Sequence, residues 1–355
     1  MSLIEVIAEA GSNHNGSLDA AFRLVDIAAD SGASSVKFQF IDAAGLYLPA
    51  YPVPDGYVDN KVFNLRKKEE IDFDSWKLIW QHAKSRSINI SASVFCRNSI
   101  NMLKQLGADY VKIASTDLTN HHLIDLACQS FKRVIISTGM ASLAEVLSTS
   151  DFVRKNHPST EIIFMHCVSL YPCDLAESNI GRIDALSQIL GVKIGYSDHT
   201  EDTYSSLLAL AKGATIFEKH FTYDKGASGF DHRHAMAPTE LKTYITTLNH
   251  SFASLNSKPT DPSPREAISK IRARRGVYAS RDLPVGHVLT EDDLLYVRPS
   301  TTFSCNSPDM FIGMKINHNI RRFSAIGLSS EIDDAHSNWE AANNYWNNEM
   351  KEKKM

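Results

Sequence analysis

The sequence predicts an α/β protein whose larger part is a closed (β/α)8 barrel and whose smaller part is rich in β-structure. Short β-branched runs recur through the first 220 residues, each separated from the next by a longer amphipathic stretch. This pattern is typical of repeated βα units around a parallel sheet. Eight runs favour a closed barrel over an open sheet. They cover residues 3–9, 34–40, 88–94, 109–114, 132–137, 161–168, 192–197 and 214–220.

The length of the chain predicts two domains. Its 355 residues exceed the usual size of a domain with one hydrophobic core. The stretch NSKPTDPSPRE holds three prolines and several turn formers, which is typical of a linker. We therefore expect a barrel over residues 1–256, a linker over 257–271, a small β-rich domain over 272–330 and a polar tail over 331–355.

Two helix starts and one long connection stand out between the predicted strands. Ser17 opens a helix that closes at Gly32, and Ser142 opens another with Glu145 as its capping-box partner. The segment 41–68, rich in Tyr, Pro and Gly, is too long for an ordinary connection. It is either an active-site loop or a solvated insertion without a role in substrate contact.

Composition excludes several classes of function. A formal charge of −4, with no dense basic cluster, argues against nucleic acid as a partner. No apolar run is long enough to span a membrane, and no secretory signal opens the chain, so we expect a cytoplasmic protein. Five scattered cysteines without a CxxC motif predict reduced thiols. Cys167 follows His166, but a buried small residue is a better interpretation of it than a nucleophile.

Polar residues occur at the end of almost every predicted strand. In a (β/α)8 barrel the carboxyl ends of the strands form the active site, so these residues should gather at one rim. They are Glu9, Lys37, Gln39, Lys112, Ser115, Asp117, Ser137, His166, Ser169, Ser197, Asp198, His199, Glu218 and His220.

Two of these rim residues, Lys37 and Lys112, lie within strand-like runs, where an ammonium group is costly to bury without an anion. Three serine hydroxyls accompany them. The set suits a phosphate together with a carboxylate, as in phosphoenolpyruvate or a similar small dianion. The alternative is that both lysines pair with Glu9 or Asp117 and bind no ligand. The hydroxyls belong to Ser115, Ser137 and Ser197.

Two further rim residues, His199 and His220, end adjacent strands and predict a divalent-metal site. Imidazole is a common ligand of Mn²⁺, Zn²⁺ and Fe²⁺ at sites that keep positions open for water and substrate. A rival pair, His232 and His234 beside Asp231, shares one face of an extended segment. Both pairs remain candidates on the sequence alone.

Taken in order, several short motifs resemble those of the sialic acid (nonulosonic acid) synthase family. They are IAEAGSNHNGS, VKFQ, YVKIASTD, ISTGM, HCVSLYP, IGYSDHT, FEKHF and GFDHRHAM, followed by RRGVYASRDLPVG, which resembles the start of an antifreeze-like (SAF) domain. The resemblance covers roughly residues 3–328. It implies a TIM barrel followed by an SAF domain, and a transferase that condenses phosphoenolpyruvate with an N-acylated amino hexose. The implied acceptor is N-acetylmannosamine or a 2,4-diacetamido-6-deoxy hexose, and the products are a nine-carbon 2-keto-3-deoxy acid and phosphate.

The same resemblance implies roles for individual residues. Catalysis falls to Glu9, Lys37, Lys112 and Asp231; phosphoenolpyruvate is held by Lys37, Lys112, Ser115, Ser137, Ser169 and Ser197; the sugar is held by Gln39, Asp117, Tyr171, Asp231 and Arg298; and the metal is held by His199 and His220. The implied metal is Mn²⁺, with Mg²⁺ or Co²⁺ as alternatives. The resemblance also implies a domain-swapped homodimer in which Arg298 reaches the partner's sugar pocket.

Two positions depart from the family pattern, and other functions remain alternatives. Ser169 stands where asparagine is frequent, and Asp117 where glutamate is frequent. The alternatives are a metal-dependent pyruvate aldolase, another barrel that joins phosphoenolpyruvate to an aldose, and a non-catalytic carbohydrate-binding protein. A synthase releases phosphate and an aldolase does not, so the products separate these two.

Overall fold

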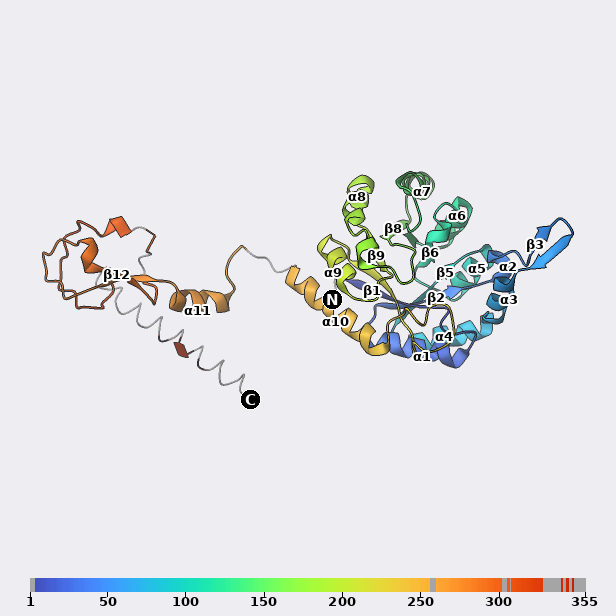
Figure 1. The fold of residues 1–355 in the computed structure, drawn as a ribbon, viewed down its shortest axis with the longest axis horizontal. Coiled ribbons are helices and arrows are strands. Elements are labelled where there is room, and N and C mark those ends of the chain that lie inside the picture. Colours follow the sequence, from blue (N-terminus) through green and yellow to red (C-terminus); the bar gives the residue numbers. More distant parts are fainter. Residues whose placement is uncertain are drawn as a thin grey trace. The chain divides into compact units, whose positions relative to one another are not determined.

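The computed structural model describes residues 4–255, 260–301, 305–306 and 308–327, together with 340, 343, 344 and 347. The chain divides into two units, Met1–Ser257 and Lys258–Met355 (Figure 1). The polar tail expected over 331–355 lies almost entirely outside the described residues. No helix of the described parts is both long and apolar enough to cross a bilayer.

The first unit contains a closed barrel of eight parallel strands. Around the barrel the strand order is β1-β10-β9-β8-β7-β6-β5-β2. Each of the eight predicted runs overlaps one of these strands, although β1 and β9 continue past the ends of their runs, so the predicted fold class is confirmed. Their bounds are Glu5–Gly11 for β1, Ser35–Phe40 for β2, Asn89–Val94 for β5, Val111–Ile113 for β6, Arg133–Ser137 for β7, Glu161–His166 for β8, Gly195–Asp198 for β9 and Ile216–His220 for β10.

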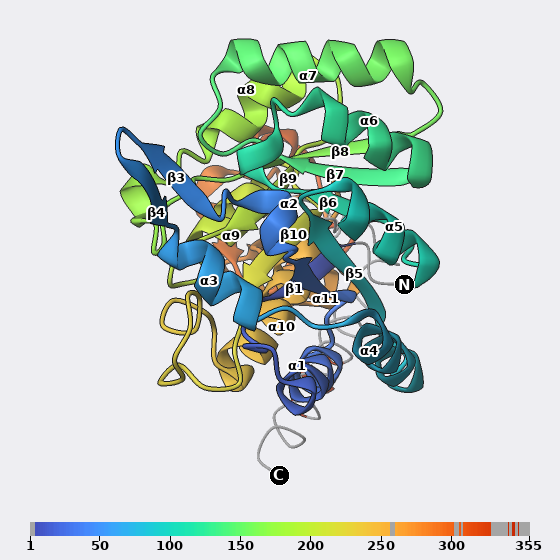
Figure 2. The ribbon, with the colours of Figure 1, turned by 90° about the vertical axis from the view of Figure 1, so that its right-hand side faces the viewer.

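Helices surround the strands, as Figure 2 shows. The outer helices are α1 (Leu18–Asp30), α4 (Phe73–Ser85), α5 (Arg97–Gln105), α6 (His121–Ser130), α7 (Leu143–Asn156), α8 (Gly181–Leu190), α9 (Tyr204–Ala211) and α10 (Pro238–Leu255). Short 3-10 turns, η1 (Ser115–Asp117) and η2 (Leu175–Glu177), follow β6 and β8. Both predicted helix starts are confirmed. The Ser17 side chain accepts a hydrogen bond from the Ala20 amide, and Ser142 with Glu145 forms a capping box.

The interior of the barrel changes from apolar to polar along the strands. Because side chains alternate across a strand, Ile7 shares a face with Glu9, and Ile135 shares a face with Ser137. A buried apolar cluster fills the amino-terminal part of the interior: Ile7, Tyr110, Ile135, Ile163 and Met165. A larger core packs between the strands and the helices. The apolar floor therefore confines the interior polar residues to the carboxyl ends of the strands.

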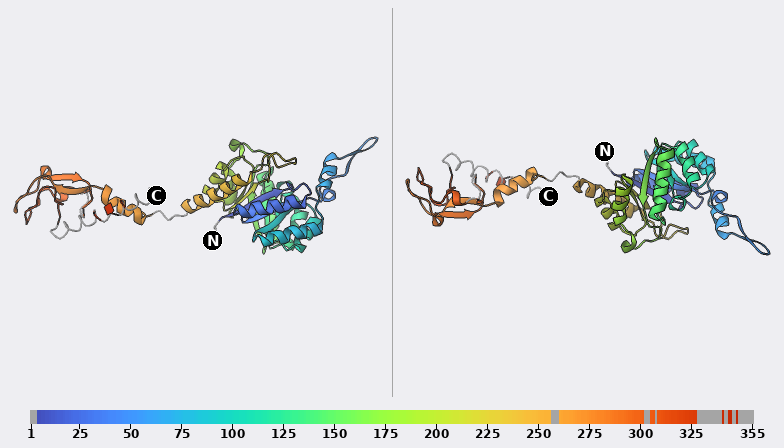
Figure 3. Two further views of the ribbon diagram at one scale, coloured as in Figure 1. Left: turned by 90° about the horizontal axis from the view of Figure 1, so that it is seen from below. Right: turned by 90° about the horizontal axis from the view of Figure 1, so that it is seen from above.

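The long segment after β2 folds into four short elements. They are α2 (Ala43–Leu46), strands β3 (Ala50–Val53) and β4 (Gly56–Asp59), which form an antiparallel hairpin, and α3 (Lys61–Lys68). The hairpin projects away from the barrel (Figure 3). None of the residues of α3 is buried. We call residues 41–68 the excursion.

The second unit is a small β-structure with its own core. Strands β11 (Gly276–Ala279) and β12 (Leu294–Val297) pair antiparallel, and 3-10 turns η3 (Glu291–Asp293) and η4 (Pro308–Met310) accompany them. Its buried residues include Val277, Leu283, Leu289 and Phe311. Helix α11 (Pro264–Ala273), capped by Ser263, occupies most of the segment expected to be a linker. Its proline lies at the helix start, where a missing amide hydrogen costs nothing.

A buried ion pair ties β9 to β10 on the outer side of the barrel. Lys219 Nζ lies 3.1 Å from Asp198 Oδ2, and both side chains are almost fully inaccessible to solvent. Lys219 also donates to the Thr200 carbonyl at 2.5 Å, and Asp198 accepts from the Ser206 hydroxyl at 2.7 Å. These bonds offset the cost of burying the two charges.

We predict that Lys219→Met lowers the free energy of unfolding by about 3–5 kcal/mol, because it leaves the Asp198 carboxylate buried and unpaired. Urea denaturation followed by circular dichroism measures the change. Lys212→Met is the matched control, since Lys212 pairs with Asp184 while both side chains are about half exposed. It should cost less than about 1 kcal/mol. Equal losses in the two variants would contradict the assignment.

Candidate active site

A cavity of about 440 Å³ opens at the carboxyl ends of the barrel strands. Eleven of the fourteen predicted site residues line it: Glu9, Lys37, Gln39, Lys112, Ser115, Ser137, Ser169, Tyr171, Ser197, His199 and His220. They come from strands β1, β2, β6, β7, β9 and β10 and from the loops that follow β6, β8 and β9. The topology of the barrel thus gathers residues that are as many as 211 positions apart in the chain, from Glu9 to His220.

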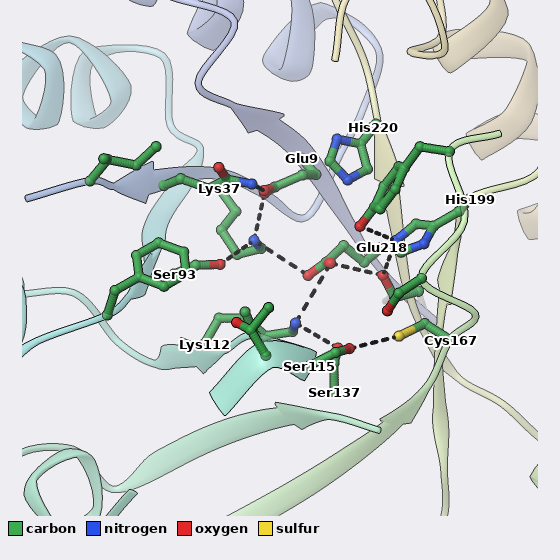
Figure 4. A pocket seen from close by; sticks show the side chains of 18 of the residues that line it. Glu9, Lys37, Ser93, Lys112, Ser115, Ser137, Cys167, His199, Glu218 and His220 are labelled. Carbon is green, nitrogen blue, oxygen red and sulfur yellow. Dashed lines mark hydrogen bonds and ion pairs between the residues drawn. The ribbon is translucent and has the colours of Figure 1, made fainter. Parts of the chain in front are cut away.

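Two lysines and two glutamates form a buried cluster at the base of this cavity (Figure 4). Lys37 Nζ lies 2.6 Å from Glu9 Oε2 and 3.6 Å from Glu218 Oε2. Lys112 Nζ lies 3.7 Å from Glu218 Oε1. Ser93 accepts a hydrogen bond from Lys37 at 2.8 Å. The two carboxylates therefore supply the anions that the buried lysines require.

Burial and charge separate the pKa values of the two carboxyl groups in this cluster. Burial opposes ionisation of Glu218, but Lys112 and Lys37 outweigh it and lower the Glu218 pKa to about 2. Burial raises the pKa of Glu9; Lys37 opposes the rise, and the charge of Glu218 adds to it. Burial also lowers the pKa of Lys112. Glu218 is thus the fixed anion and Glu9 the carboxyl group that takes up a proton more readily.

Hydroxyl groups cover the side of the cavity next to Lys112. The Lys112 ammonium donates to Ser137 Oγ at 2.7 Å, and the Gly139 amide donates to Ser115 Oγ at 3.1 Å. A Cβ atom at Gly139 would lie only 2.4 Å from Ser169 Oγ and 2.8 Å from Ser115 Oγ. Only glycine allows this close approach of backbone to hydroxyls. The lysine and the hydroxyls together provide donors for an oxyanion.

Two histidines stand on the opposite side of the cavity, with ring centroids 5.6 Å apart. His199 Nδ1 donates to the Val168 carbonyl at 2.6 Å, so Nε2 carries the lone pair, and it lies within hydrogen-bond distance of the Tyr171 hydroxyl, at 3.2 Å, and of the Ser197 hydroxyl, at 3.3 Å. Burial, together with the nearby His220, lowers the His199 pKa to about 3, so its ring is neutral at physiological pH. His220 Nδ1 is buried without a hydrogen-bond partner among the described residues and lies 3.5 Å from Asp231 Oδ2. Tyr171 stacks on His199.

In the rival histidine pair, both ring nitrogens of His232 have a hydrogen-bond partner. His232 Nδ1 bonds the Thr222 hydroxyl at 2.7 Å, and its Nε2 lies 3.3 Å from Asn15 Nδ2. The ring nitrogens of His199 also have neighbours within hydrogen-bond distance, so these contacts do not separate the two pairs. What separates them is position, because His199 and His220 line the cavity, whereas His232 and His234 are not among its lining residues. Two other rim candidates also turn away from the cavity: His166 bonds the Ser178 carbonyl, and Asp198 pairs with Lys219.

Three predicted site residues do not line the cavity. Asp231 lies beside it, against His220. Asp117, in η1, accepts hydrogen bonds from Thr116 and Asn120 instead of facing the cavity. Arg298 belongs to the second unit, where its side chain is exposed. The first unit thus groups the lysines, hydroxyls and histidines closely, whereas Asp117 of the same unit does not face them.

Other residues line the cavity without having been assigned a role from the sequence. Ser93, on β5, was missed because no rim residue was assigned to run 88–94; the alternation of Ser91 and Ser93 in ISASV was the available signal. Glu218 was noted at the rim but given no role. Cys167 is buried, as expected, and its thiol lies 3.1 Å from Ser115 Oγ. All five cysteines are free thiols.

The excursion contributes Ile41, Leu46, Tyr47 and Arg66 to the lining, which favours an active-site loop over a solvated insertion for segment 41–68. Its two ends border the cavity, whereas the hairpin between them stays exposed.

Comparison with known proteins agrees with this geometry. A sequence model described as the NeuB family matches residues 24–259, and one described as the SAF domain matches residues 274–322. The chain belongs to the NeuB family. The predicted resemblance, a barrel synthase followed by an SAF domain, is thereby confirmed, and the chain is an enzyme of the type that forms carbon–carbon bonds.

Named relatives of this NeuB chain are synthases of nonulosonic acids. An N,N'-diacetyllegionaminic acid synthase of Campylobacter jejuni is 33% identical over 87% of this chain and 94% of its own length. The enzyme of the same name from Legionella pneumophila is 32% identical over 89% and 91%. The crystal structure of a sialic acid synthetase from Leptospira borgpetersenii, in complex with citrate, matches with a TM-score of 0.67 and 32% identity, over 75% of this chain and 90% of that one.

Proposed function

We propose that this enzyme condenses phosphoenolpyruvate with an N-acylated amino hexose, giving a nine-carbon 2-keto-3-deoxy acid and phosphate. The observation that carries the proposal is one cavity in which two buried lysines and several hydroxyls face a pair of histidines. The acceptors we propose are N-acetylmannosamine or a 2,4-diacetamido-6-deoxy hexose, in keeping with the products for which the relatives are named.

The side of the cavity around Lys112 is our proposed site for the phosphate of phosphoenolpyruvate. An ammonium and two hydroxyls line this side, from Lys112, Ser115 and Ser137. The Lys112 ammonium lies 2.7 Å from Ser137 Oγ. Ser169 and Ser197 extend the hydroxyl surface, and Lys37 is placed to balance the carboxylate. Charged donors fixed in a buried site stabilise a departing phosphate without reorganisation.

The opposite side is our proposed site for the sugar aldehyde. Gln39, Tyr171 and Asp231 lie close to the histidines or to Glu9. In the reaction, C3 of phosphoenolpyruvate attacks the aldehyde carbon, water adds at C2, and the C–O bond to phosphate breaks. Glu9 holds the proton of that water, because its pKa is raised while Glu218 stays ionised. Asp231 orients the sugar from beside His220.

His199 and His220 fit a divalent cation. Their donor set is two imidazoles, one oriented by a carbonyl and the other with a buried nitrogen that lacks a hydrogen bond among the described residues. The part of the chain that the structure describes has no group of three or more His, Cys, Asp or Glu side chains placed for one ion. Two protein ligands leave positions for water and substrate, which suits Mn²⁺, or Mg²⁺ or Co²⁺. When bound, the cation would polarise the aldehyde as a Lewis acid.

The two remaining sugar-binding predictions, Asp117 and Arg298, need a second copy of the chain or a bound substrate. Arg298 makes no hydrogen bond or ion pair with the described residues, and its exposed guanidinium is free to serve another molecule. We propose a homodimer in which Arg298 of one protomer completes the sugar pocket of its partner, with Asp117 at the edge of that pocket.

Phosphate release from phosphoenolpyruvate is the test of the proposed function. With Mn²⁺ and a panel of 2-acetamido and 2,4-diacetamido hexoses, we expect metal-dependent phosphate with one acceptor and a product larger by a three-carbon acid in mass spectrometry. Product without phosphate would indicate an aldolase. Neither turnover nor phosphoenolpyruvate binding would overturn the proposal.

We predict that Glu9→Gln keeps phosphoenolpyruvate binding but lowers kcat by about 10²–10⁴-fold, the usual contribution of general acid–base catalysis. Isothermal titration calorimetry and the phosphate assay measure the two effects separately. A near-normal kcat would remove Glu9 from proton transfer.

We predict that His199→Ala loses the bound cation, because one of two protein ligands is removed. Elemental analysis of the purified protein measures metal content. His232→Ala is the comparison variant and should retain metal, since His232 does not line the cavity. The reverse result would favour the pair His232 and His234.

A further inference from the structure

The loop after β10 holds a carboxylate at the edge of the cavity. Asp231 lies in this loop, outside any helix or strand, and its Oδ2 atom is 3.5 Å from His220 Nδ1. It lines a narrow pocket next to the larger cavity, and Tyr171, His199 and His220 line both. A Cβ atom at Gly11 would lie only 2.7 Å from Asp231 Oδ2, so the carboxylate packs against the end of β1. Its position therefore depends on what holds the loop.

The next residue, His232, fastens this loop through both of its ring nitrogens. Its side chain is fully buried. Nδ1 lies 2.7 Å from Thr222 Oγ1, near the start of the same loop, and Nε2 lies 3.3 Å from Asn15 Nδ2, in the loop after β1. Asn15 also donates to the Ser228 carbonyl at 2.7 Å. One imidazole thus connects two parts of the loop after β10 with the loop after β1.

The neighbours of this ring are compatible with one arrangement of its proton. Thr222 Oγ1 lies 3.1 Å from the Asp224 carbonyl, which can only accept, so the hydroxyl hydrogen goes there. The Thr222 oxygen then accepts from His232 Nδ1, as it does from the Asp224 amide at 3.0 Å. His232 Nε2 is left to accept from the Asn15 side-chain amide. Burial lowers the pKa of His232, which favours this neutral ring.

Backbone bonds alone do not determine where Asp231 lies. The Met236 amide donates to the His220 carbonyl at 2.9 Å and closes the loop at its base. This bond fixes where the loop rejoins the barrel, but Asp231 is five residues before Met236. The bond between His232 and Asn15 crosses to the loop after β1, close to the strand end on which the carboxylate packs.

We infer that His232 is a positioning residue, which fastens the loop after β10 to the loop after β1 and thereby holds the Asp231 carboxylate on the sugar side of the cavity. The inference rests on the proposed function, in which Asp231 orients the acceptor. It gives the DHRHAM segment a task other than metal binding, because Asp231 faces the site and His232 keeps it there.

The test removes the hydroxyl that accepts from the His232 ring. Thr222→Val removes this hydroxyl, whereas Thr222→Ser retains it. Thr149→Val is the matched control: the Thr149 hydroxyl is also buried, lies 3.2 Å from His121 Nε2 and donates to the Leu118 carbonyl at 2.8 Å, but it belongs to α7 and does not line the cavity. Phosphate release gives kcat and the KM values for the acceptor sugar and for phosphoenolpyruvate. Hydrogen–deuterium exchange reports on the loop, and thermal unfolding reports on the fold.

We expect Thr222→Val to lower kcat/KM for the acceptor sugar about 10- to 100-fold, the effect of a misplaced carboxylate, with less than about threefold change in KM for phosphoenolpyruvate. Thr222→Ser should recover most of the loss, and Thr149→Val should match wild type in both kinetic constants. Amide exchange over residues 224–234 should be faster in Thr222→Val and unchanged in Thr149→Val.

A double variant tests whether the hydroxyl acts through Asp231. Asp231→Asn should itself lower kcat/KM for the sugar, and adding Thr222→Val should lower it less than about threefold further, because the two residues act in one chain of contacts. If Thr222→Val does not fold, Asn15→Gly makes the same test from the other ring nitrogen, since Asn15 has a φ of 48° that glycine readily adopts.

Four results would overturn the inference: wild-type kinetics in Thr222→Val, an equal loss in Thr149→Val, an equal rise in KM for both substrates, or full additivity with Asp231→Asn. Exchange separates this inference from the proposed function, because it needs no turnover. Faster exchange confined to residues 224–234 of Thr222→Val, in a protein that releases no phosphate with any acceptor, would support the fastening by His232 and refute the synthase. Unchanged exchange and an unchanged rate would refute the role of His232 and leave the synthase standing.

Discussion

The four-residue cluster of Lys37, Lys112, Glu9 and Glu218 governs the chemistry of this barrel. Two ammonium groups cannot remain buried and charged without anions nearby, and two carboxylates cannot remain buried and ionised without cations. Each residue comes from a different strand, so the closed barrel is what brings them together. The cluster is neutral as a whole, which keeps a polar interior compatible with a stable fold.

Within this neutral cluster, the carboxyl groups of Glu218 and Glu9 differ in how firmly their negative charge is stabilised. Glu218 contacts both lysines and the Ser197 hydroxyl, so its charge is held firmly. Glu9 has Lys37 and Gln39 as its neighbours and lies near the negative charge of Glu218. One carboxylate therefore fixes the lysines while the other is able to exchange a proton. The apolar floor beneath them keeps this exchange at the open end of the barrel.

Much of this arrangement could be predicted from the sequence, because strand ends in a parallel barrel share one rim. The eight runs located the strands, and residue type at each end located the lysines, serines and histidines. The sequence could not predict whether a side chain at a strand end points into the cavity or away from it. His166 and Asp198 stand at strand ends like the others, but their side chains turn to Ser178 and Lys219. Nor could spacing reveal that Arg66, 57 positions after Glu9, returns to the cavity on a helix that follows an exposed hairpin.

The excursion is attached to the barrel with little apolar burial, since no residue of α3 is fully buried and only the Arg66 side chain is largely covered. Polar and stacking contacts hold it: Arg66 with Ser12 and Phe230, and Glu70 with the Ala43 amide. Its sequence is therefore largely independent of the packing that stabilises the barrel. Through mutation or exchange of this segment alone, descendants of one barrel could acquire new acceptor ranges while inheriting the same catalytic centre unchanged.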